Sequence, residues 1–194
     1  MLEILRMGAA SDCVIDRLGG DVEVPRGLSG LFGVGGIFHV ECYDSDGNFR
    51  WADDAKNAVV TVGLNSLLDV YLRNQTQIAS WYLGLVDNSG FTAYAAADTM
   101  SSHTGWTESV AYSNANRVTW SPAAAASASI SNTSTSDFTI NGTATVKGIF
   151  LTSSNTKSGT TGTLFATASF TGGNQTVNSG DTLKVTYTVN ATSS

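Results

Sequence analysis

The sequence predicts a mainly β protein, an antiparallel β-sandwich of the jelly-roll or Ig-like kind with one amphipathic helix and an extended N-terminal arm. After Pro122 the chain is rich in Ser and Thr and contains short segments of alternating apolar residues, as strands with one buried face do. Turn residues such as Gly172-Gly173-Asn174 separate these segments. Only one segment has the helical period. We therefore expect an arm at 1–36 and one sandwich domain at 37–194, with a helix at about 63–74.

The bulk properties exclude several classes of partner. The 194 residues are enough to bury a core without disulfides. Only 13% of them are charged and the isoelectric point is about 4.6, so neither nucleic acid nor an anionic membrane is an expected partner. No window is long enough for a membrane span, and the first residues lack the apolar region of a signal peptide, so we expect synthesis in the cytosol. Cys13 and Cys42 stand far apart and are expected to be buried free thiols.

The segment Met1–Gly36 is glycine-rich and keeps no sustained apolar period. It cannot bury enough surface on itself, so it is either a solvated tail or an arm that packs on a neighbouring subunit. Its scattered large apolar residues favour the arm. The candidate contact residues are Leu28, Leu31 and Phe32.

The residues that follow predict a hairpin. The alternation over Ile37–Tyr43 predicts a strand with one apolar face, formed by Phe38, Val40 and Cys42. A turn at 44–47 leads to a return strand at 49–51. Asp44-x-Asp46-Gly47 also resembles part of a calcium loop, but it lacks the remaining acidic ligands, so we favour the turn. We expect a polar connection at 53–57 and a strand at 58–62.

The centre of the chain predicts the helix and the central strand. A stripe with helical spacing is formed by Leu64, Leu67, Leu68, Tyr71 and Leu72, and we expect it to pack on the core. The apolar run at 78–86 predicts a strand buried on both faces. A long loop at 91–108 and a strand at 117–120, ended by Pro122, follow.

The final third predicts short strands. Asn141-Gly142 is the strongest two-residue hairpin signal in the chain and is expected to join the strand around Phe138 to the strand at 143–152. Another strand is expected at 164–170. The last strand, at 183–189, alternates strictly between apolar and polar residues.

The sequence contains no pattern that selects a catalytic, metal or cofactor site. His39 and His103 lack metal-ligand spacing, and Ser101-Ser102 is not in a strand-turn-helix elbow. Asp53-Asp54 is interpreted as solvated surface. Trp106, in a loop beside Glu108, is the candidate for an interface and the alternative candidate for a sugar-binding groove.

Several strings together resemble a family of small structural proteins of tailed-bacteriophage virions. They are KNAVVTVGLNSLLDV (56–70), DTMSSHTGWTESVAYSNANRVTW (98–120), INGTATVKGIFL (140–151), KSGTTGTLFATASF (157–170) and GDTLKVTYT (180–188). The resemblance covers roughly residues 36–191 and brings no catalytic residues with it.

The resemblance implies a protein of the capsid surface, made in the bacterial cytoplasm. We expect a capsid decoration (cement) protein, not an enzyme, that binds the major capsid protein and stabilises contacts between its subunits. Alternatives are a neck or tail adaptor, a fibre-base component, or a receptor- or glycan-binding module. We also expect a homo-oligomer, either a trimer or a dimer.

Overall fold

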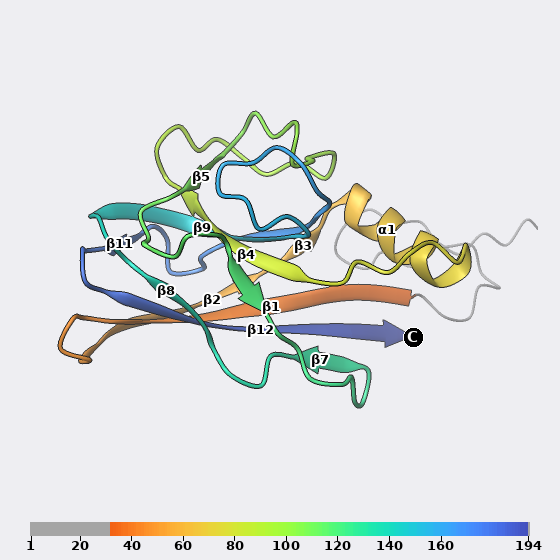
Figure 1. The fold of residues 1–194 in the computed structure, drawn as a ribbon, viewed down its shortest axis with the longest axis horizontal. Coiled ribbons are helices and arrows are strands. Elements are labelled where there is room, and N and C mark those ends of the chain that lie inside the picture. Colours follow the sequence, from red (N-terminus) through yellow and green to blue (C-terminus); the bar gives the residue numbers. More distant parts are fainter. Residues whose placement is uncertain (1–31, 194) are drawn as a thin grey trace, which may run out of the picture. The chain divides into compact units, whose positions relative to one another are not determined.

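The computed structural model describes residues 32–193, of which Val34–Ala191 form one compact unit. This unit is mainly β, with two antiparallel sheets and one helix in the described part of the chain, so the predicted sandwich is confirmed (Figure 1). Residues 1–31 of the predicted arm, with Cys13, lie outside the described residues. Residues 32–36 belong to the first strand, so the predicted boundary at residue 36 is too late.

The first sheet, here sheet A, has the order β2-β1-β12-β7, and β8 also pairs with β12. Its strands are β1 (Phe32–Tyr43), β2 (Phe49–Lys56), β7 (Ser129–Ser131), β8 (Ser136–Thr139) and β12 (Thr182–Ser193). The predicted hairpin between β1 and β2 is confirmed. Strand β2 continues to Lys56, so the polar connection expected at 53–57 is wrong, because Asp53 and Asp54 still pair with β1.

The second sheet, sheet B, has the order β3-β10-β9-β4-β5, with β11 on β9 and β6 on β4. Its strands are β3 (Ala58–Val59), β4 (Trp81–Asp87), β5 (Thr107–Ser109), β6 (Val118–Trp120), β9 (Ala144–Thr152), β10 (Leu164–Ser169) and β11 (Gln175–Val177). Strand β4 pairs with β9 on one side and with β5 and β6 on the other. The predicted central strand is therefore confirmed.

Sheet B is covered on both faces. Leu83, Leu85 and Ile149 belong to the cluster between the sheets, whereas Val86 and Phe150 belong to a second cluster with Trp106. The second cluster lies where the loop at 88–106 crosses the outer face of sheet B (Figure 1). This double coverage explains why β4 is apolar on both faces.

The prediction of a hairpin at Asn141-Gly142 is wrong. Strand β8 before it pairs with β12 in sheet A, whereas β9 after it lies in sheet B, so these residues cross from one sheet to the other. Neither residue has the positive φ that a type I′ turn requires. Instead, Ile140 exchanges backbone hydrogen bonds with Gly180 and Asp181, and Asn141 donates to Ala111. These bonds hold the crossover against the rest of the fold.

Helix α1 (Thr61–Leu72) is the one helix of the described residues, two residues earlier than expected at each end. It begins immediately after β3, which is shorter than the predicted strand at 58–62. It ends where Asn74 takes a positive φ of 56°, a conformation that asparagine tolerates. No helix in the described part of the chain is long and apolar enough to cross a membrane.

Candidate interaction surface

Helix α1 is attached to the sandwich through its first turns, and Leu67 is the member of the predicted stripe that packs on the core. The amide of Thr61 donates to the carbonyl of Ala96 at 2.8 Å, and that of Val60 donates to Phe165 at 3.0 Å. A Cβ at Gly63 would stand 2.5 Å from the carbonyl oxygen of Phe165, so only glycine permits this approach. The face that docks is centred on Gly63, with Leu67 and Val70 half-buried on the same side.

The predicted stripe is mostly on the outside, and this prediction is wrong. Tyr71 is 85% exposed and Leu72 is 72% exposed, and Leu64 and Leu68 are also exposed. The reason is that the helix has two apolar faces, and the face with Gly63 packs more closely than the bulkier one. We call the exposed set Leu64, Leu68, Tyr71 and Leu72 the outer face of α1.

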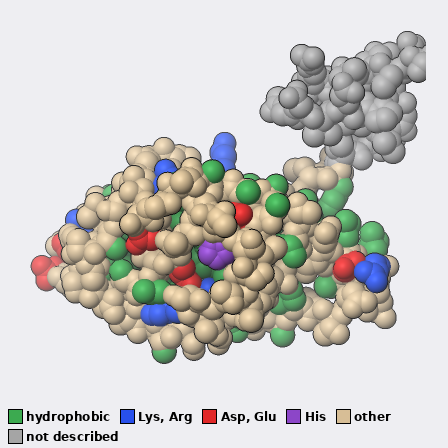
Figure 2. All heavy atoms as spheres, turned by 90° about the horizontal axis from the view of Figure 1, so that it is seen from above, with side chains coloured by type: hydrophobic (Ala, Val, Ile, Leu, Met, Phe, Trp, Pro, Cys, Tyr) green, Lys and Arg blue, Asp and Glu red, His purple; other side chains and the backbone are tan. Residues whose placement is uncertain are grey.

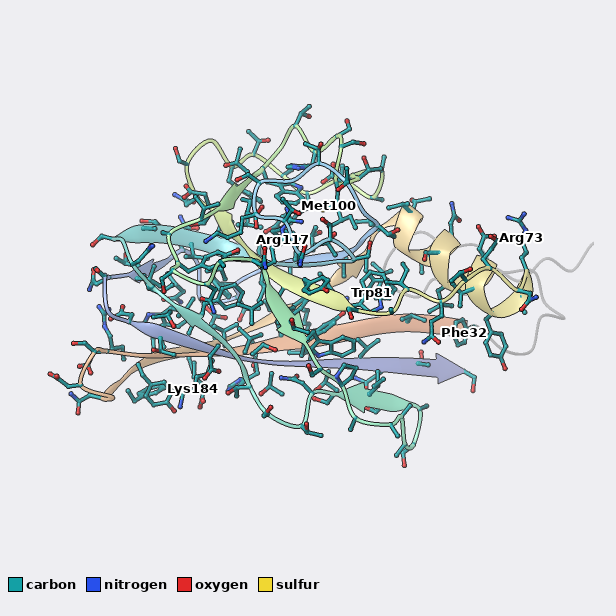
Figure 3. The ribbon with its side chains drawn as sticks, in the orientation of Figure 1. Phe32, Arg73, Trp81, Met100, Arg117 and Lys184 are labelled. Atoms are coloured by element: carbon teal, nitrogen blue, oxygen red, sulfur yellow. The ribbon has the colours of Figure 1, made fainter. Side chains whose placement is uncertain are left out.

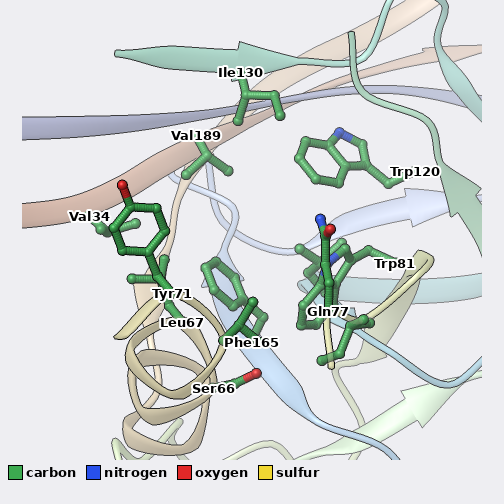
Figure 4. Close-up of a pocket in the computed structure, with 13 residues that line it drawn as sticks. Val34, Ser66, Leu67, Tyr71, Gln77, Trp81, Trp120, Ile130, Phe165 and Val189 are labelled. Carbon is green, nitrogen blue, oxygen red and sulfur yellow. The ribbon is translucent and has the colours of Figure 1, made fainter. Parts of the chain in front are cut away.

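A groove of about 300 Å³ lies beside this helix and is lined by residues of both sheets (Figure 4). Sheet A contributes Val34, Ile130 and Val189 to its wall. From the helix come Leu67 and Tyr71, and Tyr71 therefore both lines the groove and projects into solvent.

The opposite wall of the groove is aromatic. Trp81 on β4 is the cross-strand partner of Trp120 on β6, and Trp81 also contacts Phe165 edge-on at a centroid distance of 5.4 Å. The indole N–H of Trp120 donates to the carbonyl of Tyr187 at 3.2 Å. With that donor used, Trp120 presents apolar ring surface, and the groove suits an apolar occupant better than a polar one.

Charge is scarce around the outer face of α1. The helix contains one charged residue, Asp69, and its carboxylate accepts a hydrogen bond from the guanidinium of Arg73 at 2.9 Å. Arg73 lies at the outer end of the helix (Figure 3). In the space-filling view, hydrophobic side chains reach the surface in several places, with acidic and basic side chains among them (Figure 2).

The predicted contact residues do not come together in one described place. Leu28 and Leu31 lie outside the described residues. Phe32 begins β1 and is 64% exposed, and its role as a contact residue stays a prediction.

Trp106, the candidate interface residue, does not lie on the surface. It is 2% exposed, packs against Phe150 and donates its indole N–H to Asp98 at 2.9 Å. The ring of His103 stacks on it at a centroid distance of 3.9 Å. Trp106 therefore anchors the 88–106 loop, and neither a partner contact nor a sugar-binding role through this side chain is supported.

A buried ion pair joins the outer loops. Glu108 accepts two hydrogen bonds from Arg117, from Nε at 2.9 Å and from an Nη at 2.8 Å. Arg117 also donates to the carbonyls of Ser154 and Gly159, and its guanidinium lies 5.2 Å from the centre of the Phe150 ring. Figure 3 shows Arg117 in the interior. Because the guanidinium donates to two carbonyls of the loop at 153–163, the ion pair holds this loop in place.

Two acidic positions from the sequence also serve the fold. Asp44 accepts from the amides of Asp46 and Asn48, as the predicted turn requires. Asp53 is 6% exposed, so its interpretation as solvated surface is wrong.

In the described residues no three His, Cys, Asp or Glu side chains are grouped to hold a metal. Cys42 is confirmed as a buried free thiol, and burial, together with the nearby Asp181, raises its pKa to about 12.

Asp53 provides a test by pH. Burial raises its pKa, but hydrogen bonds from Gln175, Thr171 and Gly172 lower it by more, so the pKa lies below its usual value. A lowered folded-state pKa contributes stability above the unfolded value near 4, and this contribution is lost as the pH falls through the folded value. We expect Asp53→Asn to cost about 2 kcal/mol in the free energy of unfolding at pH 6 and to flatten its fall toward pH 3.

Urea denaturation across this pH range measures both effects. Asp54→Asn is the matched control, because the neighbouring carboxylate is exposed and bonds to His39 instead. An unchanged acid profile in Asp53→Asn would contradict the assignment.

A comparison with models of known protein families and with curated protein sequences finds no match.

Proposed function

We propose that this chain is a structural protein of a tailed-bacteriophage particle, namely a decoration protein on the outer shell of the head that binds the major capsid protein. The observation that carries the proposal is the outer face of α1, which keeps Tyr71 and Leu72 outside the core of a well-packed sandwich. Apolar side chains gathered on one surface are typical of proteins that act through contact with a neighbour. The resemblance of residues 36–191 to virion proteins is the reason to place the chain in a phage particle.

The N-terminal segment is proposed as the part that attaches to the shell. Its apolar residues, Leu28 and Leu31 among them, cannot form a core of their own, and an extended segment can add its backbone and side chains to a neighbouring subunit. Since β1 begins at Phe32, the segment to remove is residues 1–31.

We expect the chain without residues 1–31 to fold but not to attach. Circular dichroism would show the strand signal and a melting temperature within a few degrees of the full chain. Co-sedimentation with particles that lack the protein would show no binding, whereas the full chain restores it. If the shortened chain attaches as well as the full one, the segment is not the attachment device.

Cryo-electron microscopy of the particle tests the location. Copies that follow the symmetry of the head shell are expected. About a dozen copies or fewer in a ring would instead assign the chain to the neck or tail, and absence from the particle would refute the proposal.

A further inference from the structure

We propose that the outer face of α1 and the groove beside it form a two-fold contact with a second copy of this chain, in which Tyr71 of each copy enters the groove of the other. The inference goes beyond the proposed function: a second copy occupies the outer face of α1, and attachment to the shell then rests on residues 1–31. It concerns the purified protein, so it can fail while the location in the particle stands.

The shape of this surface is the first argument. A two-fold contact needs a surface that is its own complement, so that a projecting part and a hollow lie side by side on each copy. Tyr71 projects at 85% exposure and lines a groove of about 300 Å³. A cavity of roughly 150 Å³ accepts a benzene ring. The groove therefore has room for the phenol ring of a partner's tyrosine, with Trp81 and Phe165 as its aromatic wall.

The charges are the second argument. Asp69 and Arg73 form an ion pair beside the outer face, one turn apart on the same side of the helix. Each copy thus offers one carboxylate and one guanidinium, and an antiparallel approach of two helices places unlike charges together. The chain carries a formal net charge of −6, but no second acid lies on this helix. Two copies can meet here without like-charge repulsion.

The size of the surface limits the strength of the contact. A full aromatic side chain buries roughly 150–250 Å², so the four exposed side chains together present on the order of 400 Å². The walls of the groove add to this. A standard interface buries about 800 Å² from each partner, and the helix face with the groove stays below this, so we expect a weak dimer that forms at high protein concentration.

A membrane is a poorer occupant. Helices that lie on membrane surfaces are rich in Lys and Arg on their polar face, whereas Thr61–Leu72 contains none. The negative net charge would also be repelled by anionic lipids.

Light scattering after size exclusion, together with sedimentation equilibrium, tests the inference on the full chain. We expect a dimer with twice the 20.2 kDa mass of the chain. In Tyr71→Asp we expect the dissociation constant of the dimer to be at least tenfold larger. The side chain is exposed, so the variant should keep its melting temperature. Val110→Asp is the matched control, since Val110 is also exposed but does not line the groove, and it should leave the dimer intact.

The symmetry of the contact can be tested separately. In a Cys13→Ser background, Leu72→Cys is expected to link two copies through a disulfide between the two introduced cysteines under mild oxidation. Val110→Cys is not expected to form such a link. A monomer, a trimer, or a dimer unaffected by Tyr71→Asp would overturn the proposal. So would a dimer that depends on residues 1–31 but not on Tyr71, because the N-terminal segment would then be the occupant.

Discussion

Arg117→Met is expected to lower the free energy of unfolding by about 3–5 kcal/mol, because it leaves the carboxylate of Glu108 buried without its counter-ion. The substitution also frees the carbonyls of Ser154 and Gly159, which accept hydrogen bonds from the guanidinium at 2.9 and 3.1 Å. Glu108 would keep only the amide of Ser158 and the hydroxyl of Tyr112 as donors. Urea denaturation followed by tryptophan fluorescence measures the loss.

The surface ion pair provides the matched control. Arg73→Met removes a guanidinium from a similar bond to Asp69, but both side chains are exposed, and such a pair contributes about 0.5 kcal/mol or less. The double variant Glu108→Leu/Arg117→Met should lose less than the sum of its two single variants, because no unpaired ion remains. Additive losses would show that the ion pair does not act as a unit.

Gly148→Ala is expected to cost about 3 kcal/mol or more, at or beyond the upper end of what overpacking usually costs. A Cβ at this position would stand 1.9 Å from the carbonyl oxygen of Ala168 and 2.6 Å from the hydroxyl of Tyr94. The carbonyl belongs to strand β10, which pairs with β9, so it cannot move without disturbing the ladder. Thermal and urea unfolding would measure the change.

Gly142→Ala tests whether the effect comes from the site and not from the residue type. A Cβ at Gly142 would have no atom within 4 Å, and the residue has no positive φ. We expect the stability of this variant to be unchanged or raised by about 0.5 kcal/mol, since alanine restricts the unfolded chain. Equal losses in the two variants would contradict the packing argument.

The strands of this protein are largely predictable because their burial follows the alternation of the residues. Phe38, Val40 and Cys42 are fully buried on one face of β1, as the alternation predicts, and Leu183, Val185 and Tyr187 are buried in the same way on β12. The apolar run around Leu83 is also predictable, because a strand covered on both sides has no polar face to preserve.

The wrong predictions for the helix stripe and for Asn141-Gly142 share a physical cause. A local pattern does not show what a segment packs against. The helix has a bulky apolar stripe, but its contact is decided by Gly63, whose missing side chain allows the backbone of Phe165 to approach. Asn141-Gly142 has the residues of a hairpin turn, but its flanking strands pair with partners far along the chain.

The candidate surface is predictable only in part. The helical spacing identifies Tyr71 as apolar and helical but not as exposed, and the groove combines Val34, Trp120 and Val189, which are distant in sequence. The signal in the sequence that the stripe would be exposed is Gly63, which lies on the other side of the helix and permits close docking there. The signal that Trp106 is buried is the nearby Asp98, because a buried indole N–H needs an acceptor and this carboxylate provides it.

The place of β12 in sheet A affects how the protein is made. It lies between β1 and the strands β7 and β8, although it comes last among the strands along the chain. During translation, the hairpin of β1 and β2 emerges from the ribosome long before the strand that covers Phe38. The nascent chain therefore carries an uncovered apolar hairpin while about 130 residues are still being added, as expected for folds rich in non-local pairing. We expect such a nascent chain to bind ribosome-associated chaperones.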